Sequence, residues 1–182
     1  MEKDATSAGV EHGGLFSTAE IKILICYILS AINEPVPVDM LANVLHYEGI
    51  VNGFEVSNAI VALSASGQIE PTDSNETNYV VTKSGREVAE TLKTSLSAVV
   101  KERAYLASMK MLAKFKNAKD NRFEITKEHG ATYLSCSAID GGKPFITVKM
   151  LITDDDQGRC IKERFLENPS KIYSQIIDLL TK

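Results

Sequence analysis

The chain has 182 residues, of which 44% are hydrophobic and 24% are charged, and its formal net charge is −4 at pH 7. This length allows one large domain or two small ones, and this composition is typical of an ordinary soluble protein with a filled core. The N-terminal stretch MEKDATSAGVEHGG lacks the apolar core of a signal peptide, and no apolar run approaches the roughly 18 residues that span a bilayer, so we expect a cytoplasmic protein with no membrane partner.

The first elements in the chain are a tail and a buried helix. Residues 1–14 are small, polar and glycine-bearing, which is typical of a flexible tail. A helix follows to about Ala31 and is apolar nearly all round, so we expect it to lie at the centre of a domain. The segment Asn33-Glu34-Pro35-Val36-Pro37 ends this helix, because proline cannot donate a hydrogen bond inside a helix.

Two short helices, at 38–45 and about 54–65, come next and are separated by a turn with two glycines. Two such helices behind a buried first helix predict a helix-turn-helix. A hairpin over 68–82 adds a wing, whose tip Asp73-Ser74-Asn75-Glu76 has no positive charge. We therefore assign a winged helix-turn-helix domain to residues 15–95.

A long helix is expected after the hairpin. From near Ser84 to about Asn117 there is no proline and no glycine after Gly85, and apolar residues recur at spacings of three, four and seven. This stripe packs either on its own domain or against a second copy of the chain; beyond residue 95 it outreaches a small domain, and there we expect a homodimer. The connecting and dimerisation helix is assigned to 96–120. Its candidate contact residues are Leu96, Val99, Leu106 and Met109.

Residues 121–182 predict a second domain. Period-two patterns at Phe123–Ile125, 131–139 and 145–152 indicate strands, with Asp140-Gly141-Gly142 as a turn, and 154–166 and 170–180 indicate two closing helices. The fold class is therefore α+β. It comprises an N-terminal winged helix-turn-helix, a long connecting helix, and a small C-terminal antiparallel sheet with two helices.

Three segments carry a family resemblance: ALSASGQIE before the hairpin, NYVVTKSGREVAETL after it, and IYSQIIDLL near the C-terminus. They resemble an uncharacterised bacterial family with a domain-of-unknown-function label, whose winged helix is similar to those of PadR-type and MarR-type regulators. The likeness covers most of residues 15–182. Thr82, Gly85 and Arg86 match a winged-helix signature, in which the glycine lets the strand turn sharply into the helix. The resemblance implies a winged-helix fold, which serves both DNA binding and protein interaction.

Charge divides the chain. Between Ile23 and Thr82 there is no Lys or Arg and there are seven acidic residues, so the helix-turn-helix repels DNA phosphates. Between Lys83 and Lys127, eleven basic residues face five acidic ones, a net of +6. We expect Lys83 and Arg86 to contact phosphates at the base of the wing. The other lysines are expected to form the solvated face of the long helix.

The outward face of the second short helix is expected to carry the recognition residues. Asn58 is the candidate for reading a base edge, with Asn52 and Ser57 as assistants. Phe54 and Val61 on the same face are typical of a protein contact instead. Two hypotheses follow: a dimeric transcriptional regulator that binds double-stranded DNA and has a C-terminal sensing or dimerisation domain, or a winged-helix module that binds a protein at its acidic face and does not bind DNA.

Catalysis finds little support in the sequence. His46 and His129 are lone histidines beside turns, and the acids after Thr153 are explained by capping of the next helix. Cys26, Cys136 and Cys160 are far apart and each lies among apolar residues, so we expect three core residues and no disulfide or zinc site. We expect no enzyme, no metal and no cofactor.

Overall fold

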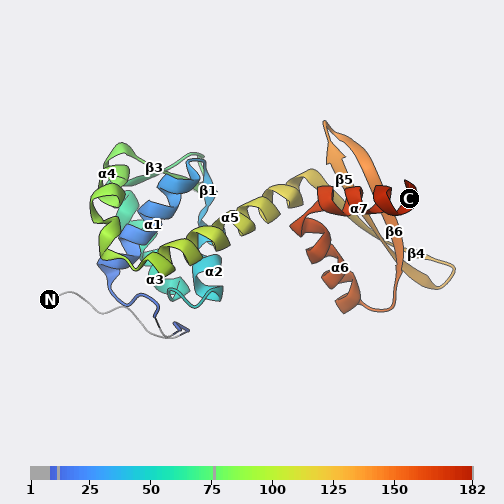
Figure 1. Cartoon of the computed structure of the whole chain (residues 1–182), viewed down its shortest axis with the longest axis horizontal. Helices are drawn as coiled ribbons and strands as arrows, with labels where there is room; N and C mark the ends of the chain where they lie inside the picture. Colours follow the sequence, from blue (N-terminus) through green and yellow to red (C-terminus); the bar gives the residue numbers. More distant parts are fainter. Residues whose placement is uncertain (1–8, 12, 76, 182) are drawn as a thin grey trace. The chain divides into compact units, whose positions relative to one another are not determined.

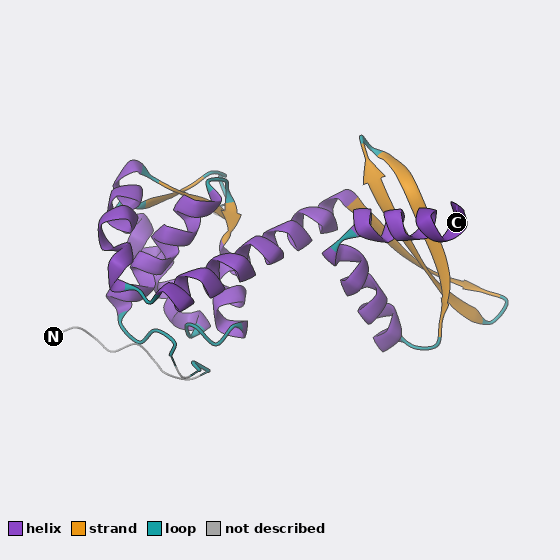
Figure 2. Ribbon diagram, in the orientation of Figure 1, coloured by secondary structure: helices purple, strands orange, loops and turns teal. Residues whose placement is uncertain are grey.

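The computed structural model describes residues 9–11, 13–75 and 77–181. The chain divides into two compact units, which we call the N-terminal unit (Met1–Leu112) and the C-terminal unit (Ala113–Lys182). Figure 1 follows the chain through both, and Figure 2 shows mostly helices in the first and long strands together with helices in the second. The predicted α+β fold class is confirmed. None of the described helices is both long and apolar enough to cross a membrane.

Helix α1 (Thr18–Ile32) is the centre of the N-terminal unit. It buries Ile21, Ile23, Leu24, Ile25, Cys26, Ile28 and Leu29, so nearly its whole circumference is inside, as its sequence predicts. The helix ends at Asn33, which takes a left-handed conformation with φ of 56°. Asparagine tolerates this conformation better than most residues, so the chain reverses here before the first proline.

The helix-turn-helix and its wing follow α1. Helices α2 (Val38–Tyr47) and α3 (Gly53–Ala65) pack on each other, and β1 (Val36–Pro37), β2 (Ile69–Pro71) and β3 (Asn78–Val81) form an antiparallel sheet in the order β1-β3-β2. In the hairpin, Ile69 pairs with Val81 and Pro71 with Tyr79. The predicted winged helix-turn-helix is therefore confirmed as an arrangement of elements.

The predicted single helix from Ser84 to Asn117 is wrong. The structure has α4 (Lys83–Leu92), a 3₁₀ turn (Lys93–Ser95) and then α5 (Ala98–Asp120). Leu96 between them is extended, with φ of −89° and ψ of 140°, and only 4% of it is exposed. Burying this leucine in the core of its own unit turns the chain, which a smooth helix over 84–117 would not do.

Helix α5 packs most of its length on the N-terminal unit. Its buried residues are Val100, Ala104, Ser108 and Leu112, each four positions after the last, so they form one stripe along the helix. The unit boundary falls directly after Leu112. More than half of the segment 96–120, expected to connect the domains, thus belongs to the N-terminal unit.

The C-terminal unit is a three-stranded antiparallel sheet with two helices. Strands β4 (Asn121–Glu128), β5 (Ala131–Asp140) and β6 (Lys143–Ile152) lie in that order, followed by α6 (Asp155–Glu167) and α7 (Pro169–Thr181). The predicted hairpin turn is confirmed, since Gly141 and Gly142 both have positive φ and Asp140 pairs with Lys143.

One face of this sheet carries the core of the C-terminal unit. Leu134, Cys136 and Ala138 alternate along β5 and are buried there with Ile152 and Phe165. Ile161 of α6 and Ile172 of α7 pack against the same cluster, so both helices cover this face. Cys26 and Cys136 are buried as expected, but the expectation that Cys160 is a core residue is wrong, because it lies exposed on α6.

Candidate nucleic-acid interface

The turn between α2 and α3 is held by backbone hydrogen bonds. The amides of Ile50 and Val51 donate to the carbonyl of Leu45 over 3.0 and 3.1 Å, and both side chains are buried. Gly49 has φ of 61°, a left-handed conformation that glycine adopts without strain. Asn52 then caps α3, because its Oδ1 accepts the amide of Phe54 over 2.9 Å. The direction of α3 is therefore fixed by its own sequence and by two buried apolar side chains.

The outward face of α3 agrees with the prediction. Phe54 and Val61 are each 69% exposed, and Ser57 and Asn58 are exposed beside them. The three polar candidates for base reading differ, however. Asn52 uses its side chain as the helix cap, and the Ser57 hydroxyl donates to the carbonyl of Gly53 over 3.2 Å. Asn58 has no hydrogen bond of its side chain to any described residue, so its amide is the group ready to meet a base edge.

A shallow groove of about 390 Å³ runs between α2 and α3. Its lining residues are Asp39, Ala42, Asn43, His46, Gly53, Phe54 and Ser57. This lining holds one carboxylate, one histidine and no Lys or Arg. The groove therefore adds hydrogen-bonding groups next to the face of α3 but no attraction for phosphate.

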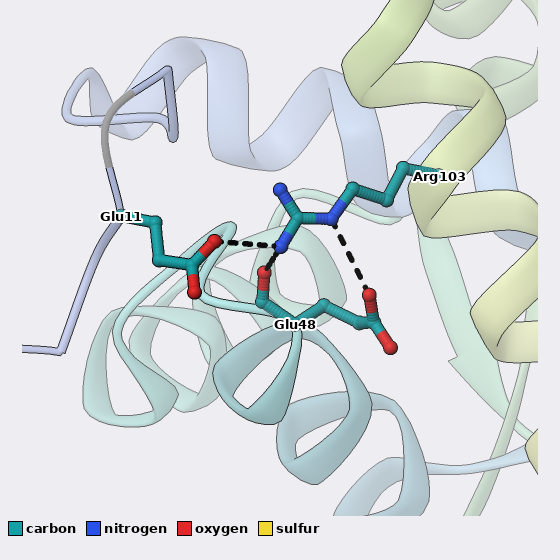
Figure 3. A network of polar contacts seen from close by, with 3 residues as sticks. All are labelled: Glu11, Glu48 and Arg103. Carbon is teal, nitrogen blue, oxygen red and sulfur yellow. Dashed lines mark hydrogen bonds and ion pairs between the residues drawn. The ribbon is translucent and has the colours of Figure 1, made fainter.

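Arg103 of α5 lies beside the turn between α2 and α3 (Figure 3). Its guanidinium donates to the carboxylate of Glu48 over 3.3 Å, to the backbone carbonyl of Glu48, and to the carboxylate of Glu11 over 3.0 Å. The amide of Glu11 also donates to the carbonyl of Gly49 over 2.8 Å. One arginine thus neutralises an acid of the α2–α3 turn and ties both that turn and Glu11 to α5.

Residues 1–14 were expected to form a flexible tail. Residues 1–8 and 12 lie outside the described residues. Glu11 is hydrogen-bonded to Arg103 and Gly49, and the amide of Leu15 donates to the carbonyl of Ile50 over 2.8 Å. The end of the segment assigned to the tail is therefore attached to the helix-turn-helix.

The tip of the wing is organised by Asp73. Its two carboxylate oxygens accept the amides of Asn75, Thr77 and Asn78 over 3.1, 2.9 and 3.0 Å, the Thr77 hydroxyl over 2.9 Å, and the Asn78 side chain over 2.7 Å. The Asp73 carboxylate, whose charge was expected to repel DNA, thus also shapes the loop. Glu76, the other acid expected at the tip, lies outside the described residues. The hydrogen bonds, led by that of the Thr77 amide, lower the pKa of Asp73 from 3.8 to about 2.

Because the pKa of Asp73 is lower in the folded chain than in the unfolded one, its contribution to stability is complete above pH 3.8 and is lost as the pH falls towards 2. We therefore expect the wing tip to loosen between these values while the cores remain packed. Replacement of Asp73 with alanine should produce the loose tip at neutral pH. Hydrogen exchange of the Thr77 and Asn78 amides measures both effects, and protection unchanged by the substitution would contradict the assignment.

The start of α4 carries the two phosphate candidates. Lys83 and Arg86 are exposed in its first turns, as expected, and the Arg86 guanidinium donates to Oδ1 of Asn33 over 2.8 Å. Gly85 between them does not need its conformational freedom, since its φ is not positive. A side chain at Gly85 would meet the carbonyl oxygen of Gln68 at 2.1 Å. The expected reason for this glycine is therefore wrong: the glycine lets α4 approach the backbone of Gln68, the residue before β2.

The four candidate contact residues of the long helix separate into two groups. Leu96 is buried in its own unit, so its assignment to an intermolecular contact is wrong. Val99, Leu106 and Met109 are 71%, 57% and 38% exposed, and they lie on a side of α5 away from the stripe of Val100 and Ala104. These three remain available to a partner.

Groups with reactive or metal-binding chemistry do not gather in the described part of the chain, where no three His, Cys, Asp or Glu side chains could hold a metal ion together. Burial raises the pKa of the Cys26 thiol to about 11, and burial also raises that of Cys136. Both thiols are therefore protonated at neutral pH, the state in which a thiol is a poor nucleophile and a poor ligand.

Residues 21–180 match the family model described as "Domain of unknown function (DUF4364)". The match spans most of the chain, which therefore belongs to this family. No curated protein and no solved structure matches the chain.

Proposed function

We propose that this member of the DUF4364 family is a homodimeric transcriptional regulator that contacts duplex DNA through its winged helix-turn-helix. The observation that carries the proposal is the outward face of α3, where Ser57 and Asn58 stand exposed on the second helix of a helix-turn-helix with a hairpin behind it. In this arrangement the second helix enters the major groove. An asparagine amide there can pair with the N6 and N7 edge of adenine, which gives Asn58 the recognition role.

Lys83 and Arg86 supply the phosphate contacts in this proposal. Arg86 uses one of the five hydrogen-bond donors of its guanidinium to bind Asn33, so other donors remain for a phosphate. Such contacts set the position of the protein on the duplex without reading sequence. The seven acidic residues between Ile23 and Thr82 oppose them, so binding is weak, and the phosphate contacts make it weaker as the salt concentration rises.

The dimer in this proposal forms along the exposed apolar side of α5. Val99, Leu106 and Met109 are spaced by seven and three positions, the separation of residues on one face of a pairing helix. A dimer would present two α3 helices to half-sites about 34 Å apart, one duplex turn. A signal received by the C-terminal unit would act by changing that separation.

The test is fluorescence anisotropy with a labelled generic duplex across a salt series, comparing the wild type with the double variant Lys83→Glu, Arg86→Glu. We expect the double variant to bind at least about tenfold more weakly at low salt, and the slope of log affinity against log salt to shrink by about two, one for each lost phosphate contact.

The matched control is Lys143→Glu, Lys171→Glu, which makes the same change in net charge at two exposed positions of the C-terminal unit. We expect it to keep most of the wild-type affinity. Equal losses in the two double variants, or no binding by the wild type even at low salt, would refute the DNA proposal.

A second candidate function is supported by Phe54 and Val61, each 69% exposed on the same face of α3. Two large apolar side chains on an acidic surface suit a protein partner with a basic, partly apolar surface. This function predicts that the Lys83→Glu, Arg86→Glu variant retains its partner, so the variant that removes DNA binding also separates the two candidates.

A further inference from the structure

The C-terminal unit contains a pocket of about 500 Å³ on the face of its sheet that the helices cover. This volume falls in the range of sites that hold small molecules, roughly 300 to 1,000 Å³. Its lining residues are Phe123, Ile125, Leu134, Ile152, Asp155, Gly158, Arg159 and Lys162. All three strands and α6 contribute to it, so the pocket is a product of the fold of this unit alone.

The apolar wall of the pocket is set by strand register. Phe123 pairs with Cys136 and Ile125 pairs with Leu134, so all four side chains lie on the core face of the sheet. Leu134 and Cys136 are fully buried, whereas Ile125 is 60% exposed on that same face. The core face therefore continues past the area that α6 and α7 cover, which leaves an apolar surface open to a ligand.

Helix α6 closes one side of the pocket through Gly158. A Cβ atom at this buried glycine would lie 3.1 Å from Cδ1 of Ile152, so the helix rests almost directly on β6. Ile152 is only 4% exposed as a result. The same closeness brings the next side chains of α6, Arg159 and Lys162, to the pocket.

The lining of the pocket holds two cations and one carboxylate, and the two cations differ in their contacts. Arg159 and Lys162 are three positions apart on α6, and Asp155 is the carboxylate of the lining. Arg159 also donates to Asp156 over 2.8 Å. Lys162 instead holds its ammonium over the ring of Phe123, 5.1 Å from the ring centroid. Burial raises the pKa of Cys136, and the positive charge of Lys162 opposes that rise. The charge of Lys162 is therefore felt at the apolar wall of the pocket.

We infer that this pocket binds a small amphipathic carboxylate, with its apolar body against Phe123, Ile125 and Leu134 and its anionic head at Lys162 and Arg159. A carboxylate suits the site because a cation beside apolar surface attracts an anion more strongly than the same cation in open water. An aliphatic or aromatic body suits the wall, which offers carbon atoms over most of its area. The inference is independent of DNA binding and concerns the free protein.

The test is isothermal titration calorimetry of the full chain without DNA, using octanoate below its micelle concentration as the probe. Octylamine and 1-octanol, which share the apolar body, serve as the cationic and neutral comparisons. We expect octanoate to bind one per chain, at least about tenfold more tightly than octylamine and more tightly than 1-octanol. Bound octanoate should also raise the midpoint of thermal unfolding.

Three variants locate the site. Lys162→Glu should weaken octanoate binding by at least about tenfold, because it replaces the attracting charge with a repelling one. Ile125→Glu should do the same by placing a carboxylate in the wall, and its exposure makes this substitution tolerable for folding. Lys171→Glu changes an exposed lysine of α7 outside the pocket and should leave the affinity unchanged.

Equal affinity for octanoate and octylamine, an affinity unchanged in Lys162→Glu, or no heat of binding at millimolar octanoate would each overturn the inference. Circular dichroism of each variant confirms that it is folded before titration. Since the titrations contain no DNA, a negative result here leaves the regulator proposal standing, and failure of the DNA experiment leaves this pocket standing.

Discussion

Replacing Gly85 with alanine should lower the free energy of unfolding of the N-terminal unit by about 3 kcal/mol, the upper part of the usual range for overpacking. The added Cβ would lie 2.1 Å from the carbonyl oxygen of Gln68 and 2.7 Å from Cγ2 of Val81. Alanine is favoured over glycine inside a helix by about 1 kcal/mol, which the steric conflict exceeds. The stability should therefore fall, although helix propensity alone predicts a rise.

The conflict is costly because neither side can move freely. The Gln68 carbonyl accepts the amide of Thr82 over 3.0 Å, and the Thr82 hydroxyl shares its one proton between the carbonyls of Gly67 at 2.8 Å and Gln68 at 3.1 Å. The same hydroxyl accepts the amide of Gly85 over 3.2 Å, so one threonine joins the end of β3, the start of β2 and the cap of α4. Any shift that relieves the added methyl group stretches these bonds, each of which contributes about 1 kcal/mol.

Urea unfolding followed by far-ultraviolet circular dichroism measures the loss, and hydrogen exchange at Val81 and Thr82 places it at the base of the wing. Ser84→Ala is the control, because Ser84 is the exposed neighbour of Gly85 on the same helical turn. We expect that control to change stability by no more than about 0.5 kcal/mol. A Gly85→Ala protein as stable as the wild type would show that α4 does not approach Gln68 this closely.

Reversing the charge of Arg103 should lower the free energy of unfolding by about 2 kcal/mol, which is what a hydrogen bond to a charged group contributes. The Arg103→Glu variant loses the bonds to Glu11 and to the side chain and carbonyl of Glu48, and it places a third carboxylate beside two others. The Arg103 side chain is 39% exposed, so water replaces part of what is lost and keeps the cost below that of a buried ion pair.

Two further variants separate charge from geometry at this site. Arg103→Lys keeps the positive charge without the planar fork, so we expect an intermediate loss. Arg122→Glu makes the same change in charge at an exposed position of β4 and should have little effect. Urea unfolding at low and high salt is the measurement, and salt should narrow the gap between Arg103→Glu and the wild type. A loss in Arg122→Glu equal to that in Arg103→Glu would mean that net charge, and not the network in Figure 3, sets the effect.

Local sequence signals predicted much of the fold. Prolines and glycines mark where α1 ends, where α3 begins and where the hairpins lie, and a period of two marks β5 and β6. The outward face of α3 was also predictable, because the residues of a helix that face the core fix those that face away. The Asn58 and Val61 candidates were found in this way.

Other site features were not predicted, one because its partners are distant in sequence and the others because a local hydrogen bond was overlooked. Arg103 meets Glu11 across 92 positions of sequence, and nothing in the pattern of either segment predicts that pair. Asn52 and Ser57 looked like free polar groups, but a helix cap and a bond to a backbone carbonyl occupy them. The sequence showed Asp73 as a negative charge in a turn. It did not show that this carboxylate accepts five hydrogen bonds.

The sequence by itself determined the order of most helices and strands, the wing and the acidic character of the helix-turn-helix, because these depend on the nature of residues and on their spacing to near neighbours. Only the tertiary structure decided which side of the chain after the wing is inside. Leu96 and Val99 carry the same apolar signal, yet one is 4% exposed and the other 71%. Periodicity shows that an apolar stripe of a helix must be covered, but what covers it depends on the position of distant segments. The pocket of the C-terminal unit is likewise formed by strands and a helix that meet only on folding.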